Sequence, residues 1–277
     1  MPRLYQKLIT DKVAIFSMAI LVLVLICAFL APLIAPYNPY EQNLAERRKA
    51  PSSRHWLGTD EFGRDILSRI IYGAKNTMII GVLSVAIGLL IGSLLGLIAG
   101  YYGGLIDVGI MRFIDLMLAF PYFLLAILIV ATLGPGMINS TIAIGIATVP
   151  DYARVVRGAV LTIRGKLFIQ AEVAIGSGHF RIIFGHILPN VFAPIIVLAT
   201  LRLASSVLGG AGLGFLGLGT QPPNPEWGVM LSGGRSFLID APHISLFPGI
   251  ALALLVLSFN LFGDALRDYL DPRLRNR

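Results

Sequence analysis

A polar, basic segment from Leu167 to Asn190 stands between two long apolar runs of the chain. Six of its residues combine types and spacing that fit a functional role: Gln170, Ala171, Glu172, Gly176, Leu188 and Pro189. The alanine and glycine are small enough for a partner surface to approach closely, and the glutamate can pair with a basic group on that partner. Proline has no amide proton and tends to end a polar stretch before the next helix begins. These residues offer docking onto another protein rather than catalysis.

The sequence lacks the motifs that bind nucleotides or catalyse hydrolysis. It contains neither a Gly-x-x-x-x-Gly-Lys-Ser/Thr phosphate loop nor a His-Glu-x-x-His pair of metal ligands. His179 and His186 have no paired ligands, and the single Cys27 excludes an intrachain disulfide and a cysteine metal site. We therefore expect no catalytic residue, no metal and no cofactor. Energy for any work must come from a partner or an ion gradient.

Composition places the chain in the membrane. The mean hydropathy is +0.80, and 56% of the residues are hydrophobic. Only 13% are charged, where a soluble domain carries about a quarter. The formal net charge of +7 does not indicate a nucleic-acid partner, because the basic residues flank apolar runs instead of forming one patch. Such a distribution is typical of a chain that orients itself in a bilayer.

Six apolar runs are long enough to cross a bilayer, which takes about 20 helical residues. The first begins after Arg3, Lys7 and Lys12 and is too long for a cleaved signal peptide, whose apolar part has about 7–15 residues. Basic residues are more frequent on the side that holds both termini, so we expect both termini in the cytoplasm. The predicted spans cover about 13–34, 78–99, 108–133, 138–160, 191–218 and 244–266.

Glycines in two of the predicted spans indicate close approach of helices. Gly88, Gly92, Gly96 and Gly100 recur every four residues along one helix face, a spacing that favours tight helix packing in lipid. The fifth span ends in a cluster of glycines that includes Gly214 and Gly217. Each glycine lowers helix propensity by about 1 kcal/mol relative to alanine. This end of the span is therefore either a mobile gate near the outer mouth or a close-packed helix crossing.

Charged residues within the spans need partners, since a charge at the middle of a bilayer costs at least about 2.5–3.5 kcal/mol. Arg202 lies deep in the fifth span, where it lines a pore, snorkels toward the membrane surface or contacts a protein interface. Arg112 and Asp115 are three residues apart on one helix face, which favours an ion pair between them. Asp151, Arg154 and Arg157 lie at the inner end of the fourth span, where we expect them to hold the following loop.

The 167–190 segment resembles the coupling loop of ABC-importer permeases. That pattern is Glu-Ala-Ala, a glycine soon after, and a distal Leu-Pro, and the match runs through Ala171, Gly176, Leu188 and Pro189. Two positions depart from it: Gln170 stands where the family has Glu, and Glu172 where it has Ala. Further matches are His55-Trp56-Leu57-Gly58-Thr59-Asp60, Gly63-Arg64-Asp65, Phe215-Leu216-Gly217-Leu218-Gly219, Trp227-Gly228, Gly263-Asp264-Ala265 and Asp271-Pro272-Arg273-Leu274. Together they resemble the C-type permease of the dipeptide, oligopeptide and nickel group of ABC importers.

The resemblance implies an all-α, six-span permease of the type I importer fold in a bacterial or archaeal cytoplasmic membrane. It implies four partners: a homologous permease, two cytoplasmic ATPase subunits and an external solute-binding protein. The cargo it implies is a di- or oligopeptide, with nickel or glutathione as alternatives. A self-sufficient ion-coupled transporter and a membrane-embedded enzyme are the competing classes. Two parts follow from this organisation: residues 1–75 with the first span and an external loop, and residues 76–277 with five spans and the coupling loop at about 161–190.

Overall fold

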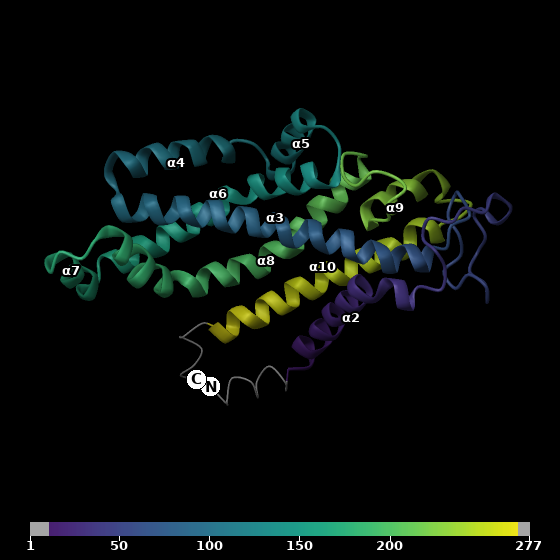
Figure 1. The fold of residues 1–277 in the computed structure, drawn as a ribbon, viewed down its shortest axis with the longest axis horizontal. Coiled ribbons are helices and arrows are strands. Elements are labelled where there is room, and N and C mark those ends of the chain that lie inside the picture. The colour runs from purple at the N-terminus through teal and green to yellow at the C-terminus, as the bar shows by residue number, and fades with distance from the viewer. Residues whose placement is uncertain (1–10, 271–277) are drawn as a thin grey trace.

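The computed structural model describes residues 11–270, and these are almost entirely helical (Figure 1). The long helices run lengthwise, with the short α7 at one end of the molecule and the loop after α2 at the other. The elements are α2 (Lys12–Ile34), η1 (Leu44–Glu46), α3 (Ile66–Tyr102), α4 (Gly104–Leu118), α5 (Tyr122–Leu133), α6 (Met137–Arg164), α7 (Leu167–Ala174), η2 (Arg181–Ile187), α8 (Leu188–Phe215), α9 (Trp227–Gly234), η3 (Arg235–Phe237) and α10 (His243–Leu270).

Four continuous helical stretches among the described residues are long and apolar enough to cross a membrane: α2, α3, η2 with α8, and α10. The bent pair α4 and α5 counts as a fifth span if the two helices cross together. Helix α6 has 28 residues but carries Asp151, Arg154 and Arg157, which lower its mean hydropathy. It occupies the place of the fourth predicted span and packs along α3.

The third predicted span, 108–133, is not one straight helix. Helix α4 ends at Leu118 and α5 begins at Tyr122, with an angle of 91° between the two. Pro121 lies at the break, directly before α5. A proline cannot donate the backbone hydrogen bond that would continue α4, and it disfavours the helical conformation of the residue before it. The length and mean hydropathy of this run fit a single span, and Pro121 was the signal of the bend.

The four regularly spaced glycines of α3 lie against α6. A Cβ added at Gly92 would stand 2.5 Å from the carbonyl oxygen of Val149, and one at Gly96 would stand 2.6 Å from that of Ala153. Gly145 of α6 repeats the arrangement from the other side, where an added Cβ would meet the Cβ of Ile87 at 2.7 Å. The two backbones therefore approach each other too closely for any side chain at these positions.

The loop between α2 and α3 folds against the outer end of the bundle. Asp65 caps α3, because its carboxylate accepts hydrogen bonds from the amide (2.8 Å) and the hydroxyl (2.7 Å) of Ser68. The carboxylate of Asp60 accepts from the guanidinium of Arg64 at 2.6 Å, and Arg69 donates to the carbonyl of Pro39 at 2.9 Å. All of these residues are buried, including Pro39. Buried ionic groups that are fully paired hold a loop in one conformation.

Candidate functional site: the hairpin between α6 and α8

The 167–190 hairpin is built from α7, a tight turn and the π-helical η2. Helix α7 ends at Ala174, and the amide of Gly176 then donates to the carbonyl of Val173 at 3.1 Å. Gly176 has a φ of +79°, a left-handed conformation that side chains with a Cβ rarely adopt. The position of its missing Cβ faces open space, so backbone conformation rather than crowding demands glycine here.

Glu172 ties α7 to the rest of the hairpin. The hydroxyl of Ser177 donates to one oxygen of its carboxylate at 2.5 Å, and the Nε2 atom of His186 lies 3.5 Å from the other oxygen. The hydrogen bond from Ser177 holds the pKa of Glu172 below its ordinary value, and the charges of His186 and Arg181 act in the same direction. Glu172, which stands two positions from the acid of the family pattern, therefore holds the turn through contacts within the hairpin.

One face of the hairpin is anchored in the bundle. Ile169 of α7 is 1% exposed and belongs to a buried apolar cluster drawn from α3, α6, η2 and α8. The other members are Leu97, Tyr101, Val156, Val160, Ile182, Ile183, Ile187, Val191 and Ile195. Protein interiors are close-packed, so displacement of α7 must move its neighbours with it.

The opposite face of the hairpin is apolar and uncovered. Leu167, Ile175 and Phe180 are 82%, 76% and 75% exposed. Gln170 and Ala171, two of the predicted docking residues, are also exposed on α7. Strongly exposed large apolar side chains on one short segment are typical of a site that another protein covers.

Leu188 and Pro189 lie where the hairpin passes into the next long helix. They are the first two residues of α8, and η2 leads into this helix without a break, so that 181–215 forms one helical stretch. The hairpin is therefore continuous with the span that follows it.

The charged residues of the predicted spans form pairs between helices. Asp115 of α4 pairs with Arg154 of α6 at 2.7 Å, so the expected pair with Arg112 is wrong. Sequence spacing alone could not have shown this pairing, because Arg154 and Asp115 meet only where α6 packs beside α4. Arg202 of α8 lies 3.1 Å from Asp151 of α6, and each side chain is about one-third exposed.

A second ion pair joins the first turn of α4 to the C-terminal part of α6. The guanidinium of Arg157 donates to both carboxylate oxygens of Asp107, with the Nη2 contact at 2.6 Å. Bidentate pairs of this kind combine strength with directional specificity. The sequence analysis did not single out Asp107, although its place three residues after the Gly103-Gly104 turn marks it as a first-turn acid of α4.

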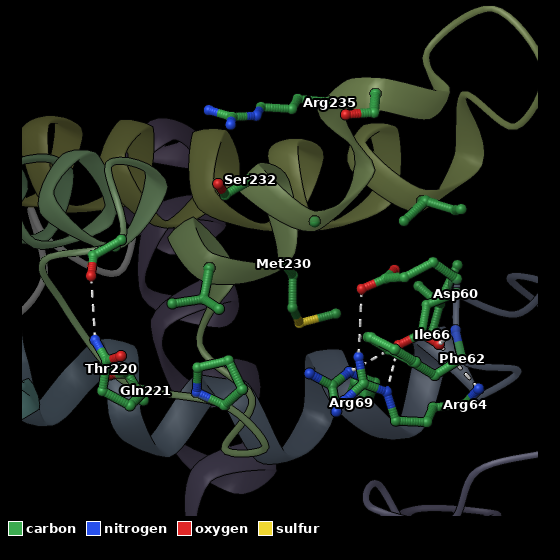
Figure 2. Close-up of a pocket in the computed structure, with 18 residues that line it drawn as sticks. Asp60, Phe62, Arg64, Ile66, Arg69, Thr220, Gln221, Met230, Ser232 and Arg235 are labelled. Atoms are coloured by element: carbon green, nitrogen blue, oxygen red, sulfur yellow. Dashed lines mark hydrogen bonds and ion pairs between the residues drawn. The ribbon is translucent and has the colours of Figure 1, made fainter.

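The glycines predicted as a pore or gate lie at the other end of the molecule. Gly214 and Gly217 line a cavity of about 420 Å³ between the outer loop and α9. Figure 2 shows Asp60, Arg64 and Arg69 on one side of it and Thr220 with Gln221 on the other, with Met230 between them. Arg202 is not among the residues that line this cavity. The three predicted pore or gate residues therefore do not form one site.

A close helix crossing accounts for Gly214. Its missing Cβ would overlap the carboxylate of Glu226, which is fully buried and caps α9 by accepting from the amides of Gly228 (2.8 Å) and Val229 (3.0 Å). Burial raises the pKa of Glu226. The indole of Trp227 next to it donates to the carbonyl of Ile70 in α3 at 2.9 Å. Sequence reasoning matched Trp227-Gly228 to a family motif but missed Glu226. The available signal was the position of this acid directly before a short helix, where its side chain can accept from the first amides.

The fold and the hairpin define the class: an all-α, multi-pass membrane protein with an exposed hairpin between α6 and α8 and, among residues 11–270, no cluster of side chains able to hold a metal. The profile of the binding-protein-dependent transport system inner membrane component matches residues 92–276. A second profile, the N-terminal transmembrane domain of oligopeptide transport permease C, matches residues 3–51. The chain belongs to the first of these families, the permease subunits of ABC importers, and is not itself an enzyme.

Relatives with assigned roles cover nearly the whole chain. A dipeptide transport system permease of Alkalihalophilus pseudofirmus is 50% identical over 98% of this chain and 90% of its own length. A di/tripeptide permease of Pseudomonas aeruginosa is 46% identical, covering 98% and 92%. A glutathione permease of Pectobacterium atrosepticum is 43% identical, covering 98% and 91%.

Solved structures with a similar fold come from a methionine ABC transporter. An inward-facing form of MetNI matches 74% of this chain and 98% of its own with a TM-score of 0.58 at 20% identity, and a second form gives 0.60 at 19%. At this identity the likeness concerns the fold alone. The predictions of an all-α, polytopic permease fold and of a bacterial inner-membrane location are confirmed.

Proposed function

We propose that this chain is the permease subunit through which an ATP-driven importer moves di- or oligopeptides. It forms the translocation path with a homologous permease, and two separate ATPase subunits dock on the 167–190 hairpin. An external solute-binding protein delivers the cargo. The observation that carries the proposal is the hairpin itself: one face packed into four helices and the other face apolar and open.

The hairpin transmits motion because it packs against α3 and α6 and is continuous with α8. When the ATPase dimer closes, its surface pulls on the exposed side chains of α7 and on the turn at Gly176. The buried contacts of Ile169 pass this movement to α3 and α6, and the unbroken helix from 181 to 215 carries it into the bilayer. The chain transmits this movement and does not itself supply chemical energy.

Peptides are the cargo that the relatives favour. The permeases of A. pseudofirmus and P. aeruginosa carry dipeptide and di/tripeptide in their names, at 50% and 46% identity. Glutathione, itself a tripeptide, is the second candidate because a permease named for it is 43% identical. The same division into an N-terminal segment (1–75) and a core (76–277) is retained as part of the proposal, with α3 crossing the boundary between the two.

Reconstitution of the full complex tests the proposal. Proteoliposomes that contain both permeases, the ATPase subunits and the cognate binding protein should accumulate a labelled dipeptide only with ATP on the ATPase side. Liposomes with this chain alone should neither hydrolyse ATP nor accumulate the dipeptide. Uptake by the chain alone would contradict the proposal and favour an ion-coupled transporter, and competition by glutathione but not by dipeptides would reassign the cargo.

A further inference from the structure

The cavity of about 420 Å³ at the outer end of the bundle has no part in the docking role of the hairpin (Figure 2). The outer loop and the start of α3 form one of its walls, and α9 and the residues that follow α8 form another. Sites for small ligands usually have volumes of about 300–1,000 Å³. The cavity is therefore large enough for a small ligand.

Most of the buried charges in its wall are paired with one another. One carboxylate oxygen of Asp60 accepts from two backbone amides, at 2.9 Å and 3.0 Å. The other accepts from Nε of Arg64 at 2.6 Å and lies 3.4 Å from Nε of Arg69. Arg69 also donates to the carbonyl of Pro39 at 2.9 Å. These contacts hold the outer loop in place and leave its buried charges compensated.

Glu61, the next residue along the chain, is not compensated in this way. Among residues 11–270 no other residue donates a hydrogen bond to its carboxylate, and its one ion-pair contact there, with Nη2 of Arg64, is 3.5 Å long. Hydrogen bonds between nitrogen and oxygen are usually about 2.7–3.2 Å long. Only 21% of the Glu61 side chain is exposed, and burial, with the charge of Asp60, raises the pKa of Glu61. This carboxylate lacks a close cationic partner.

The carboxylate of Glu61 extends to the wall that α9 forms. A Cβ added at Gly233 would stand 3.1 Å from Oε1 of Glu61 and 3.6 Å from its Oε2. Both residues line the cavity. A side chain at position 233 would crowd the carboxylate, whereas glycine leaves it accessible from the cavity.

Thr220 provides a second polar group without a partner. It is 3% exposed, and its hydroxyl makes no hydrogen bond within the described part of the chain. Figure 2 shows Thr220 on the other side of the cavity from Asp60, with the side chain of Met230 between them. A buried hydroxyl without a hydrogen bond costs free energy, so it favours a ligand that supplies one.

The cavity therefore combines a carboxylate on one side, a hydroxyl on the other and an apolar side chain between them. A short peptide has the complementary groups: an ammonium at its first residue, carbonyl oxygens along its backbone and apolar side chains. An anionic ligand fits less well, because both buried arginines are already paired with Asp60. The remaining cation of the lining, Arg235, is exposed to solvent.

We propose that this cavity binds a di- or oligopeptide by its N-terminal ammonium group, which pairs with Glu61, while the hydroxyl of Thr220 donates to a carbonyl of the same peptide. The role of that peptide as cargo rests on the proposed function, whereas the binding of an ammonium rests on the cavity alone. The unbroken helical stretch 181–215 starts in the hairpin and contributes Gly214 to the cavity wall. Movement of the hairpin therefore reaches the peptide site through one helix.

Equilibrium dialysis tests the site on the purified complex of both permeases and the ATPase subunits, without ATP and without the solute-binding protein. The probes are labelled alanyl-phenylalanine and its N-acetylated form, which has no ammonium. We expect the free dipeptide to bind about tenfold more tightly, since a hydrogen bond to a charged group contributes about 1.4 kcal/mol or more. Glu61→Gln should remove this preference and leave the affinity for the acetylated form unchanged.

Glu41→Gln is the matched control, because Glu41 is an exposed acid of the same loop that does not line the cavity. This variant should keep the tenfold preference, and Thr220→Val should weaken binding of both dipeptides equally. A preference that survives Glu61→Gln, or that Glu41→Gln removes as well, would overturn the proposal. Equal binding of the two probes by the unmodified complex, or no saturable binding of either, would also overturn it.

A lysine side chain of the solute-binding protein is a second source of an ammonium group. The affinity of that protein for the complex is therefore measured in the same variants. Weaker docking of the protein in Glu61→Gln, with the dipeptide preference intact, would assign the ammonium to the protein and overturn the peptide site. Unchanged docking with loss of the preference supports the peptide. Binding is measured without ATP, so a failure of the site is distinct from a failure of ATP-driven uptake, which would contradict the proposed function.

Discussion

At the scale of single residues, the hairpin depends on the backbone of Gly176. Its φ of +79° places it in the left-handed region, while the position of its absent Cβ faces open space. A residue with a Cβ therefore pays only for backbone strain, about 1–2 kcal/mol. The turn is consequently sensitive to a change that removes no contact at all.

We expect Gly176→Ala to reduce ATP-driven uptake several-fold while leaving the amount of protein in the membrane unchanged. The strain shifts the turn away from the geometry that docks, and about 1 kcal/mol corresponds to about a fivefold change in population. Gly178→Ala is the control, because that position also faces open space and has no positive φ. Uptake assays on both variants check the prediction, and equal activity of the two would contradict it.

The lowered pKa of Glu172 gives the hairpin a pH dependence at acidic pH. A carboxylate whose folded pKa is below its ordinary value of about 4.3 stabilises the turn above that value and loses this effect as pH falls through the lower folded pKa. The amide of Ser177, which donates to the carbonyl of Glu172 at 3.0 Å, reports on the turn. Its exchange protection, corrected for intrinsic rates, should remain constant down to about pH 4.3 and then fall.

Glu172→Gln should abolish that acidic transition, because an amide does not titrate. Glu41→Gln serves as the control, since Glu41 is an exposed acid of the outer loop. An unchanged acidic transition in Glu172→Gln would show that another group controls the turn.

At the scale of helices, the contact of α3 with α6 has the least room for change. An added Cβ at Gly92 would meet a carbonyl oxygen and the Cβ of Tyr152, at 2.5 Å and 2.6 Å, and neither can rotate away. Gly109 of α4 has nothing within 4 Å of the same position. The two glycines therefore differ in packing although both lie within helices.

We expect Gly92→Ala to destabilise the protein by about 1–3 kcal/mol, the usual cost of overpacking, and Gly109→Ala to be neutral or slightly stabilising. Thermal unfolding of the purified complex, followed by the fraction that remains soluble, measures the difference. Equal unfolding temperatures for the two variants would contradict the close approach of α3 and α6.

The short α9 depends on its buried cap in a similar way. Glu226→Ala removes the acceptor for the amides of Gly228 and Val229 and leaves them unpaired, at a cost of about 1–3 kcal/mol. Glu41→Ala, an exposed change in the outer loop, should cost much less. Limited proteolysis of the 216–243 region should proceed faster in Glu226→Ala, and unchanged cleavage would show that α9 does not depend on this cap.

At the scale of the whole molecule, features that repeat along the sequence were predictable and features that depend on distant partners were not. Hydropathy indicated the apolar spans, and the four-residue glycine spacing indicated a face for close packing. The pairing of Asp115 with Arg154, in place of Arg112, depends on how α4 lies along α6. The sequence shows which charges need partners and leaves the choice between candidate partners to the fold.

The hairpin likewise has features that could be predicted from the sequence and features that could not. Its residues and their order could be recognised from the sequence. Gly176 was predicted as a small docking residue, whereas the structure places it in the turn after α7, with a φ of +79°. The continuity of η2 with α8 could not be predicted from the sequence, because a proline at position 189 is compatible with a helix end and with a first helical turn. The inward role of Glu172 depends on Ser177 and His186 meeting in space.

The central claim is that the exposed apolar face of this hairpin is cytoplasmic and covered by the ATPase subunits. Ile175→Cys in a Cys27→Ser background places one thiol on that face, because Cys27 is the only native cysteine and Ile175 is 76% exposed. A membrane-impermeant thiol reagent should leave intact cells unlabelled, label inside-out vesicles stripped of the ATPase subunits, and fail again once those subunits are restored. Labelling in intact cells, or labelling that the ATPase subunits do not block, would contradict the claim.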